Sequence, residues 1–339
     1  MCNDVRAAAE EGSVTAPRQI EPSMTFFVTV RAVSRSHRFV PKPAVVESLD
    51  FVLKATAAKY QGKIALHEYE FLSNHFHLLG TDLDGCLPDF MRDLNALLSK
   101  QLNALRGTRG TNIEKDYNLV VVNITTGDKA IEHAVYTLAN AVEAHLVERT
   151  PEWKAPNSYA LEYGEPVLAK RPETGLWSGK VAHAQRSASK RSKRAAYAGK
   201  SNVPKQVRFE LVRPPVRRDL SDKALRKHIR AEVTKVEDAL VERRKHEGRQ
   251  VAGWNRVVAK RYSDIAPKSE EFFGVRPTFS ADDADSCAEA RRHRARFLAG
   301  YRDALRAFLA GVKDVLFPFG TWLMRKRFNA PCATCAAAA

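Results

Sequence analysis

The sequence lacks several features that would place its 339 residues in other classes of protein. No apolar run approaches the roughly 20 residues that a membrane-spanning helix needs, so no such helix is expected. The first 23 residues contain no basic start followed by an apolar core, and they do not resemble a secretion signal. No glycine-rich phosphate-binding motif and no internal repeat is present, which argues against an ATP-dependent enzyme and against a solenoid.

Cysteine is also scarce, and the few cysteines present are scattered: Cys2, Cys86, Cys287, Cys332 and Cys335. A disulfide framework is not expected in a chain of this length with such spacing. The single C-x-x-C near the end has no second pair, which favours an ordinary tail over a zinc site. This usage suits a reducing compartment, and we expect a cytoplasmic, nucleoid-associated protein.

Acidic residues are too few to balance the basic ones. The chain has 55 lysines and arginines against 39 aspartates and glutamates, which gives a net charge of +16. Such an excess favours a polyanionic partner. Nucleic acid is the first candidate, because neutralising phosphates releases counterions, and an acidic membrane surface is the alternative. A hydrophobic content of 44% is enough for a proper core, in one large domain or two ordinary ones.

Hydrophobic periodicity predicts an α+β fold in the first half of the chain. The expected strands are 24–33, 64–72, 76–80 and 117–124, and the expected helices are 42–60, 87–105 and 128–147. The resulting order, β-α-β-β-α-β-α, fits a ferredoxin-like four-stranded antiparallel sheet with helices on one face. Two further helices are expected at 220–247 and 281–315, in a largely helical and basic C-terminal extension.

His75 and His77 are the first candidates for chemistry. Side chains two apart on a strand point to the same face, so both imidazoles could hold one divalent ion while Phe76 enters the core. The alternative is a pair of ordinary polar residues on an exposed sheet face, because H-x-H is common by chance. The position of the pair at the start of a central apolar strand favours the metal site.

Tyr136 and Asn140 are the second pair of candidates. They are four residues apart in the expected helix 128–147 and therefore share a helix face. That face could present a phenol nucleophile beside an amide oxygen able to complete a metal shell. A core tyrosine packed on the sheet is the alternative.

Three runs of residues resemble the single-tyrosine HUH transposases. Residues 71–79 (FLSNHFHLL) resemble the family's M-P-N-H-hydrophobic-H-L-L signature, and residues 136–147 (YTLANAVEAHLV) resemble its Y-x-x-x-N-P-V-x-A-x-L-V helix. Residues 153–159 (WKAPNSY) resemble the W-P-x-S-S-Y segment that follows. The most similar group is the REP-associated tyrosine transposases, over residues 24–165. Ser73 and Ala141 stand where the family has proline, and neither position supplies chemistry.

The resemblance implies a two-part catalytic site. His75 and His77, with Asn140 as third ligand, would bind Mg²⁺ or Mn²⁺, and Tyr136 would attack the scissile phosphate to form a 5′-phosphotyrosine. A second DNA 3′-hydroxyl would reverse the step, which gives strand transfer. The implied substrate is single-stranded or hairpin DNA, and a homodimer is an open alternative because the tyrosine helix can serve its own or a partner's histidines. No membrane partner is expected.

The charge distribution adds a second expectation about DNA. We divide the chain into a loose leader (1–23), a catalytic domain (24–165), a basic linker or DNA-binding arm (166–218) and a helical basic region (219–339). Trp177, Tyr197 and Trp254 are available for base stacking. The residues expected to bind DNA phosphates are Lys190, Arg191, Lys193, Arg194, Lys205, Arg208, Arg213, Arg217 and Arg218.

Three alternative functions remain open from the sequence. A non-catalytic nucleic-acid-binding module would use the same ferredoxin-like scaffold, but it needs neither the histidine pair nor the spacing of Tyr136 and Asn140. A replication initiator or a relaxase would share the chemistry, although relaxases usually place the tyrosine before the histidines. A metal-dependent hydrolase would use the histidines without Tyr136.

Overall fold

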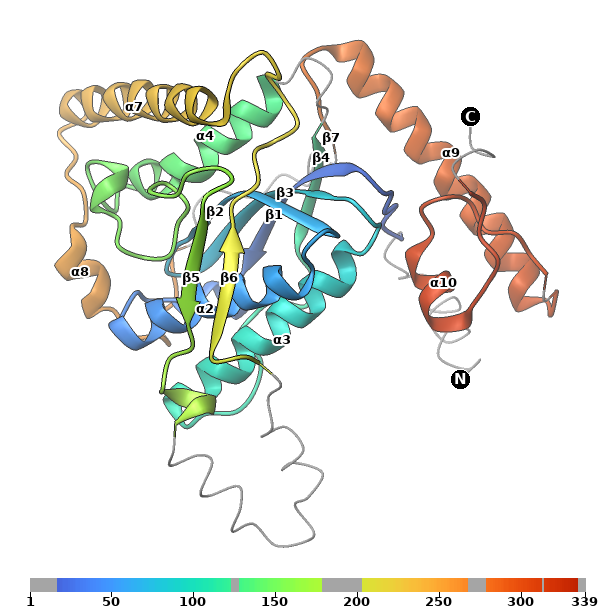
Figure 1. Cartoon of the computed structure of the whole chain (residues 1–339), viewed down its shortest axis with the longest axis horizontal. Coiled ribbons are helices and arrows are strands. Elements are labelled where there is room, and N and C mark those ends of the chain that lie inside the picture. Colours follow the sequence, from blue (N-terminus) through green and yellow to red (C-terminus); the bar gives the residue numbers. More distant parts are fainter. Residues whose placement is uncertain (1–16, 123–127, 179–202, 268–278, 313, 335–339) are drawn as a thin grey trace, which may run out of the picture.

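A five-stranded mixed sheet lies at the centre of the molecule (Figure 1). The computed structural model describes residues 17–122, 128–178, 203–267, 279–312 and 314–334. The strand order is β2-β3-β1-β4-β7. The strands are β1 (Met24–Arg31), β2 (Ile64–Phe71), β3 (His75–Asp82), β4 (Asn118–Val122) and β7 (Phe279–Ser280).

The first four strands match the predicted order, but the predicted purely antiparallel four-stranded sheet is wrong. β7 extends the sheet by pairing with β4 in parallel, Val121 opposite Phe279 and Val122 opposite Ser280. A strand of two residues has no period for sequence analysis to detect, and its partner lies more than 150 positions earlier in the chain.

The prediction that helices cover only one face of the sheet is also wrong. On β1, Phe27 contacts His133 and Tyr136 of α4 (Asp128–Glu143), so α4 lies on the face of Phe27. Phe26 and Val28 point the other way because strand residues alternate. That second face is covered by α2 (Pro43–Lys59) and α3 (Leu87–Arg106) (Figure 1).

α2 and α3 form where the sequence predicts them. Each begins with a proline at its first or second position, where the missing N–H costs nothing. α3 ends at Gly107, whose φ of 64° is the left-handed conformation that glycine adopts without strain. The ring of Tyr60, just after α2, packs edge-on against Phe90 of α3 at 5.5 Å between centroids.

The expected basic linker is ordered where the structure describes it. β5 (Pro166–Lys170) and β6 (Gln206–Glu210) form a second, two-stranded sheet. Its inner side chains, Ala169 and Val207, pack with Phe51 of α2. The short helical turn η3 (Gly175–Trp177) follows β5, and Trp177 contacts Phe51 edge-on. This sheet was not predicted, because each strand has only five residues and the two lie on either side of a long basic stretch.

The helix expected at 220–247 is confirmed as α7 (Asp222–His246), with Ser221 as its N-cap accepting from the Ala224 N–H. α7 lies along α4 on the side of α4 that faces away from the sheet (Figure 1). Its buried face includes Arg226, which forms an ion pair with Glu68 of β2. α7 is therefore part of the folded core rather than a free arm.

The last third of the described chain contributes three more helices: α8 (Trp254–Ala259), α9 (Ala284–Leu309) and α10 (Trp322–Phe328). α9 and α10 build their own small apolar cluster around Phe297, Tyr301 and Phe317, to one side of the sheet (Figure 1). Residues 17–23 of the expected leader pack here, where Ile20 is buried and its N–H donates to Gly320 O. No helix among the described residues is long and apolar enough to cross a membrane.

Candidate active site

His75 and His77 lie on the face of β3 that α4 covers. β3 is an inner strand between β2 and β1, with His75 opposite Arg31, and with His77 opposite Thr29 on one side and Glu70 on the other. The two imidazole rings are 4.9 Å apart between centroids and nearly perpendicular, at 81°. The predicted placement of both histidines on one face is what the structure has.

Each imidazole is oriented by a hydrogen bond at Nδ1. His77 Nδ1 lies 3.0 Å from Thr29 Oγ1, and His75 Nδ1 lies 2.8 Å from Asn74 Oδ1. His77 Nε2 is buried and has no partner among the described residues. A ring held at one nitrogen with the other nitrogen open is the arrangement that metal-binding histidines adopt.

Burial keeps both imidazoles neutral. It lowers the pKa of His75 to about 4, although a hydrogen bond with Asn140 acts in the opposite direction. Burial also holds the pKa of His77 well below its ordinary value of 6.5, and the nearby His75 and Arg31 add to this effect. The neutral form is the one that binds a metal ion, because a protonated nitrogen has no lone pair to give.

Tyr136 projects from α4 beside His77. The two rings are 5.4 Å apart between centroids at 71°, and the side chain of Tyr136 is 40% exposed. Phe27 of β1 lies under this group and stacks on His77 at 5.1 Å and on His133 at 4.7 Å. Tyr136 is therefore held by packing on one side while solvent, or a ligand, can reach it from the other.

Asn140 connects the tyrosine to the histidines. It is 5% exposed, and its amide raises the pKa of His75 and lowers that of Tyr136, against the effect of burial in each case. The structure thus brings together all four residues that the sequence singled out, from β3 and from two successive turns of α4.

The pKa of Tyr136 is raised, first by burial and then by the carboxylate of Glu143. The hydrogen bond with Asn140 and the charge of Arg31 act in the opposite direction. A phenol in this setting is a weak nucleophile on its own, since the phenolate is the reactive form. A cation bound beside it would favour ionisation.

Glu70 and His133, which were not predicted from the sequence, border the same site. Glu70 is fully buried, its Oε2 accepts from the Ala141 N–H at 3.1 Å, and its Oε1 has no partner among the described residues. Burial raises the pKa of this carboxyl well above 4.5. His133 lies one turn before Tyr136 in α4, and burial lowers its pKa to about 4. The spacing of His133 and Tyr136 in the sequence could have revealed the histidine.

The donor set suits a divalent ion held by few protein ligands. Within the described ranges, no group of three or more His, Cys, Asp or Glu side chains is arranged to hold a metal. The ligands available are therefore the imidazoles of His75 and His77 and the amide oxygen of Asn140. The unpartnered and buried His77 Nε2 fits this assignment, because an orphaned polar atom is costly unless something binds it.

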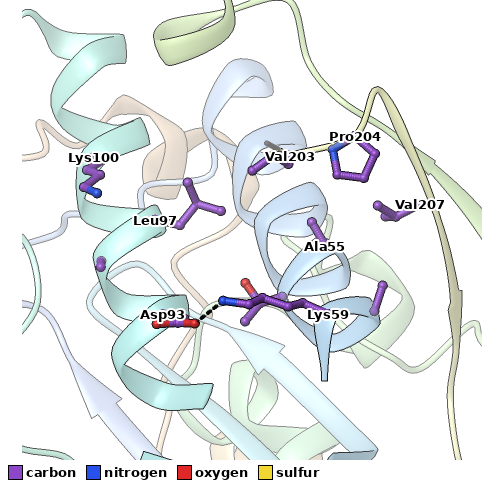
Figure 2. A pocket seen from close by; sticks show the side chains of 11 residues that line it. Ala55, Lys59, Asp93, Leu97, Lys100, Val203, Pro204 and Val207 are labelled. Atoms are coloured by element: carbon purple, nitrogen blue, oxygen red, sulfur yellow. Dashed lines mark hydrogen bonds and ion pairs between the residues drawn. The ribbon is translucent and has the colours of Figure 1, made fainter. Parts of the chain in front are cut away.

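A polar cavity of about 270 Å³ adjoins the histidines on the β4 side of β1. Thr29 and Arg31 form its wall next to the site, and the segment leading into β4 forms the rest. A larger groove of about 550 Å³ lies on the other face of the sheet, between α2 and α3, with the ion pair of Lys59 and Asp93 crossing it (Figure 2). That groove is separated from Tyr136 by the sheet and is not part of the candidate active site.

The residues expected to bind DNA phosphates fall into three groups. Lys190, Arg191, Lys193 and Arg194 lie outside the described residues. Arg213 hydrogen-bonds Leu220 O, Val216 O and Arg217 O and pairs with Asp222, and Arg217 pairs with Asp219, so both hold the turn before α7. The exposed members are Lys205, Arg208 and Arg218.

The aromatic residues expected to stack on bases are differently placed. Trp177 packs edge-on against Phe51, and Trp254 packs edge-on against the buried Trp153 at 5.6 Å. Tyr197 lies outside the described residues. Both tryptophans thus contribute to packing within the protein.

No family model and no curated protein matches this sequence. Among solved structures, the chain is similar to a REP-associated tyrosine transposase bound to a REP hairpin. The sequence identity is 14%, the match covers 43% of this chain and 82% of that one, and the TM-score is 0.35. The similarity is distant, and function therefore has to be inferred from the geometry of this chain's own residues.

Proposed function

We propose that this protein is a metal-dependent endonuclease and strand transferase that acts on single-stranded DNA through a covalent tyrosine intermediate. The observation that supports this proposal is the convergence of Tyr136, His75, His77 and Asn140 on one face of the sheet. The ring centroid of the partly exposed Tyr136 lies 5.4 Å from that of His77, whose Nε2 has no partner among the described residues. A module that only binds nucleic acid needs none of these groups in contact.

Tyr136 is the proposed nucleophile. Its phenolic oxygen forms a bond to phosphorus while the bond from phosphorus to the 3′-oxygen breaks, so that a 5′-phosphotyrosine and a free 3′-hydroxyl result. The phenol loses a proton and the departing oxygen gains one, which leaves no net proton to supply. Attack by a second 3′-hydroxyl reverses the step and joins new strands without ATP.

His75 and His77, with Asn140 as the third ligand, would hold Mg²⁺ or Mn²⁺. When bound, such an ion polarises the scissile phosphate and stabilises the charge that develops on it. Two imidazoles are also acceptable to softer divalent ions, so the identity of the ion is a question for titration. Asn140 has a second role, because its amide lowers the pKa of Tyr136 and so favours the reactive phenolate.

The proposed substrate is single-stranded DNA that carries a hairpin. The net charge of +16 favours a polyanion, and the open side of Tyr136 can admit an unpaired strand. Tyr136 lies beside the histidines of its own chain, so one copy contains a complete set of groups. A homodimer is therefore not required for the proposed chemistry, and it stays a prediction.

A denaturing gel tests the proposal. The protein is incubated with an end-labelled hairpin oligonucleotide and Mn²⁺, and a covalent protein–DNA band is expected. Tyr136→Phe should abolish the band, while Tyr301→Phe, which alters a tyrosine in the apolar cluster of α9 and α10, should retain it. His77→Ala should lose the band at any Mn²⁺ concentration that supports the wild type.

Other outcomes assign other functions. Cleavage that survives Tyr136→Phe would indicate a hydrolase that uses the histidines alone. Binding without any cleavage, over a range of divalent ions, would indicate a non-catalytic module and would overturn the proposal.

A further inference from the structure

The loop that joins β1 to α2 passes over the end of the sheet at which His75 lies. The Ala32 N–H donates to Asn74 O at 2.7 Å, and the Phe39 N–H donates to Ser73 O at 2.8 Å. Both acceptors belong to the turn that leads directly into His75. Side chains carried by this loop are therefore placed at the edge of the candidate active site.

Part of the loop has a strained backbone. Ser34 and Arg35 are consecutive and both have a φ of 54°, in the left-handed region that residues other than glycine rarely adopt. The short turn η1 (Val33–Arg35) is closed by Ser36, whose hydroxyl donates to Val33 O at 2.6 Å. Strain of this kind persists only where surrounding contacts enforce it, and it is common at binding sites.

The enforcing contacts come from residues 260–267, which follow α8. The His37 N–H donates to Asp264 O at 2.9 Å, and the Ala266 N–H donates to Arg35 O at 3.1 Å. These two hydrogen bonds flank an antiparallel β-bridge that pairs Ser36 with Ile265. A segment more than 220 positions later in the chain thus forms the second wall of this edge and brings Tyr262 to it.

Two guanidinium groups pack on the ring of Tyr262. Arg106, the last residue of α3, lies 4.6 Å from the ring centroid, and Arg38 of the loop lies 5.3 Å from it. Arg106 also donates to Arg38 O, which fixes the two segments together. The Tyr262 side chain is 36% exposed and the two arginines are half-buried, so solvent reaches one side of this group.

The charges in this group are not neutralised by the protein. In the part of the chain that the structure describes, neither Arg38 nor Arg106 has a carboxylate within ion-pair distance. The nearest acid in the segment, Asp264, accepts instead from the Arg261 N–H at 2.8 Å. Burial, and to a smaller extent the nearby charge of Arg38, lower the pKa of Arg106 to about 10.

Arg38 is the member best placed to bind a ligand. Its Nε donates to Ser36 Oγ at 2.9 Å, and within the described residues its two terminal nitrogens have no hydrogen-bond partner. A guanidinium stacked on an aromatic ring keeps its N–H edge free, and that edge matches two oxygens of one phosphate.

We propose that Arg38, Arg106 and Tyr262 form a clamp for a backbone phosphate of the DNA strand, a few nucleotides from the phosphate at Tyr136. The proposal rests on the proposed function, since it places the strand relative to that site. The clamp lies at the His75 end of the sheet, and in this proposal the strand runs from there over that end to the histidines. The exposed ring of Tyr262 offers an apolar surface to the adjoining base.

Binding measured without cleavage tests the clamp. In a Tyr136→Phe background, the affinity for a fluorescent single-stranded hairpin oligonucleotide is followed by anisotropy at several salt concentrations. Arg38→Gln should weaken binding about tenfold and reduce the slope of log K against log salt by about 0.7, the value for one lost phosphate contact on a single strand. The matched control is Arg306→Gln, which removes one positive charge from the exposed face of α9 and should leave both values unchanged.

Three further variants distinguish the clamp from a general effect of positive charge. Arg38→Lys keeps the charge but loses the flat, two-point edge, so it should retain the salt slope and still bind several-fold more weakly. Tyr262→Leu should weaken binding, while Tyr262→Phe should not. Thermal unfolding of each variant shows whether the fold is intact. Wild-type affinity and slope in Arg38→Gln would overturn the clamp.

The outcome is distinguishable from failure of the proposed function. If the wild type forms no covalent band but Arg38→Gln still loses affinity and slope, the clamp stands and the nuclease does not. If the wild type forms the band and Arg38→Gln binds normally, the nuclease stands and the clamp is wrong.

Discussion

At the scale of single residues, His77 depends on Thr29. The 3.0 Å contact at Nδ1 fixes the imidazole so that Nε2 faces the site. Residues that orient a metal ligand in this way typically contribute about 10-fold to 100-fold to metal affinity. We therefore expect Thr29→Val to raise, by about that factor, the Mn²⁺ concentration that gives half of the maximal covalent band.

Thr25→Val is the matched control for Thr29→Val. Thr25 lies on the same strand and the same face, but its hydroxyl contacts Thr81 at 3.1 Å rather than His75 or His77. The control should need no more Mn²⁺ than the wild type. An unchanged Mn²⁺ requirement in Thr29→Val would show that His77 is not oriented through this contact, or is not a ligand.

His67 makes the fold sensitive to acid. Burial lowers its pKa to about 4 from the 6.5 of the unfolded chain, while its two nitrogens contact Val212 O and Thr81 Oγ1. Between these two pKa values the unfolded state binds a proton that the folded state does not, so stability falls as pH falls through this window. The loss is up to about 1.4 kcal/mol per pH unit, and the contribution is fully present above the unfolded pKa.

His67→Gln should remove the contribution of His67 to the pH dependence of the free energy of unfolding. Urea unfolding midpoints at about pH 5 and about pH 7 measure it, and the difference between them should be smaller than in the wild type. His246→Gln, at an exposed position in α7, is the control and should keep the wild-type difference. Other buried histidines keep some acid sensitivity in both variants.

The candidate residues could be found from sequence because strand and helix periods place them without any tertiary information. His75 and His77 share a face by alternation, and Tyr136 and Asn140 share one by helical spacing. Thr29 and Glu70 could not be found in this way. Each owes its place to being opposite His77 in a neighbouring strand, and strand register follows from the packed sheet.

At the scale of elements, α7 supports the tyrosine helix. Arg226 of α7 is fully buried and pairs with Glu68 of β2, and Tyr163 and Ser158 complete the group around the carboxylate. Glu68 and Arg226 keep each other's buried charge paired only while α7 is packed in this position. The position of α4, between α7 and the sheet, therefore depends on a network that contains no residue of α4.

Arg226→Met should destabilise the protein by about 3–5 kcal/mol, because it leaves the Glu68 carboxylate buried without its cation. Urea unfolding measures the loss. Arg243→Met, which breaks an exposed pair with Glu247 on the same helix, is the control and should change little. The double variant Glu68→Leu/Arg226→Met should recover much of the stability. A small effect of Arg226→Met alone would mean that α7 is held by its apolar contacts.

The long helices were predictable, whereas the short strands β5, β6 and β7 were not. α3 and α7 have many turns and clear caps, so local sequence determines them. β7 has two residues, and β5 and β6 have five each, with strongly basic surroundings. Such strands exist because a partner strand and a hydrophobic surface are available, which only the folded chain provides.

At the scale of the whole molecule, the basic residues at 190–194 should contribute more to DNA affinity than an equal number of exposed basic residues elsewhere in the chain. Replacing Lys190, Arg191, Lys193 and Arg194 together by glutamine should weaken binding to a hairpin oligonucleotide. The slope of log K against log salt should fall by up to about 0.7 for each phosphate contact that is lost. Fluorescence anisotropy between about 50 and 200 mM salt measures both values.

Substitution is preferable to deletion in this region. Removing 180–218 would also remove β6 and the buried Phe209 and Leu211, so a loss of binding could reflect unfolding. The control is a set of four substitutions at exposed basic positions of α9 and α10: Arg302, Arg306, Arg325 and Arg327. An equal loss in both sets would show that the charge acts globally and that residues 190–194 have no special role.

The bridge between Ser36 and Ile265 has a consequence for synthesis of the protein. A nascent chain already contains both histidines, Tyr136 and Asn140 more than 120 residues before residue 265 is made. The loop beside His75 can reach its final conformation only after residue 265 has left the ribosome. Unfinished or prematurely terminated chains therefore contain His75, His77, Tyr136 and Asn140 without the completed loop that would bind a DNA strand beside them. The order of synthesis thus makes this loop the last part of the site to form.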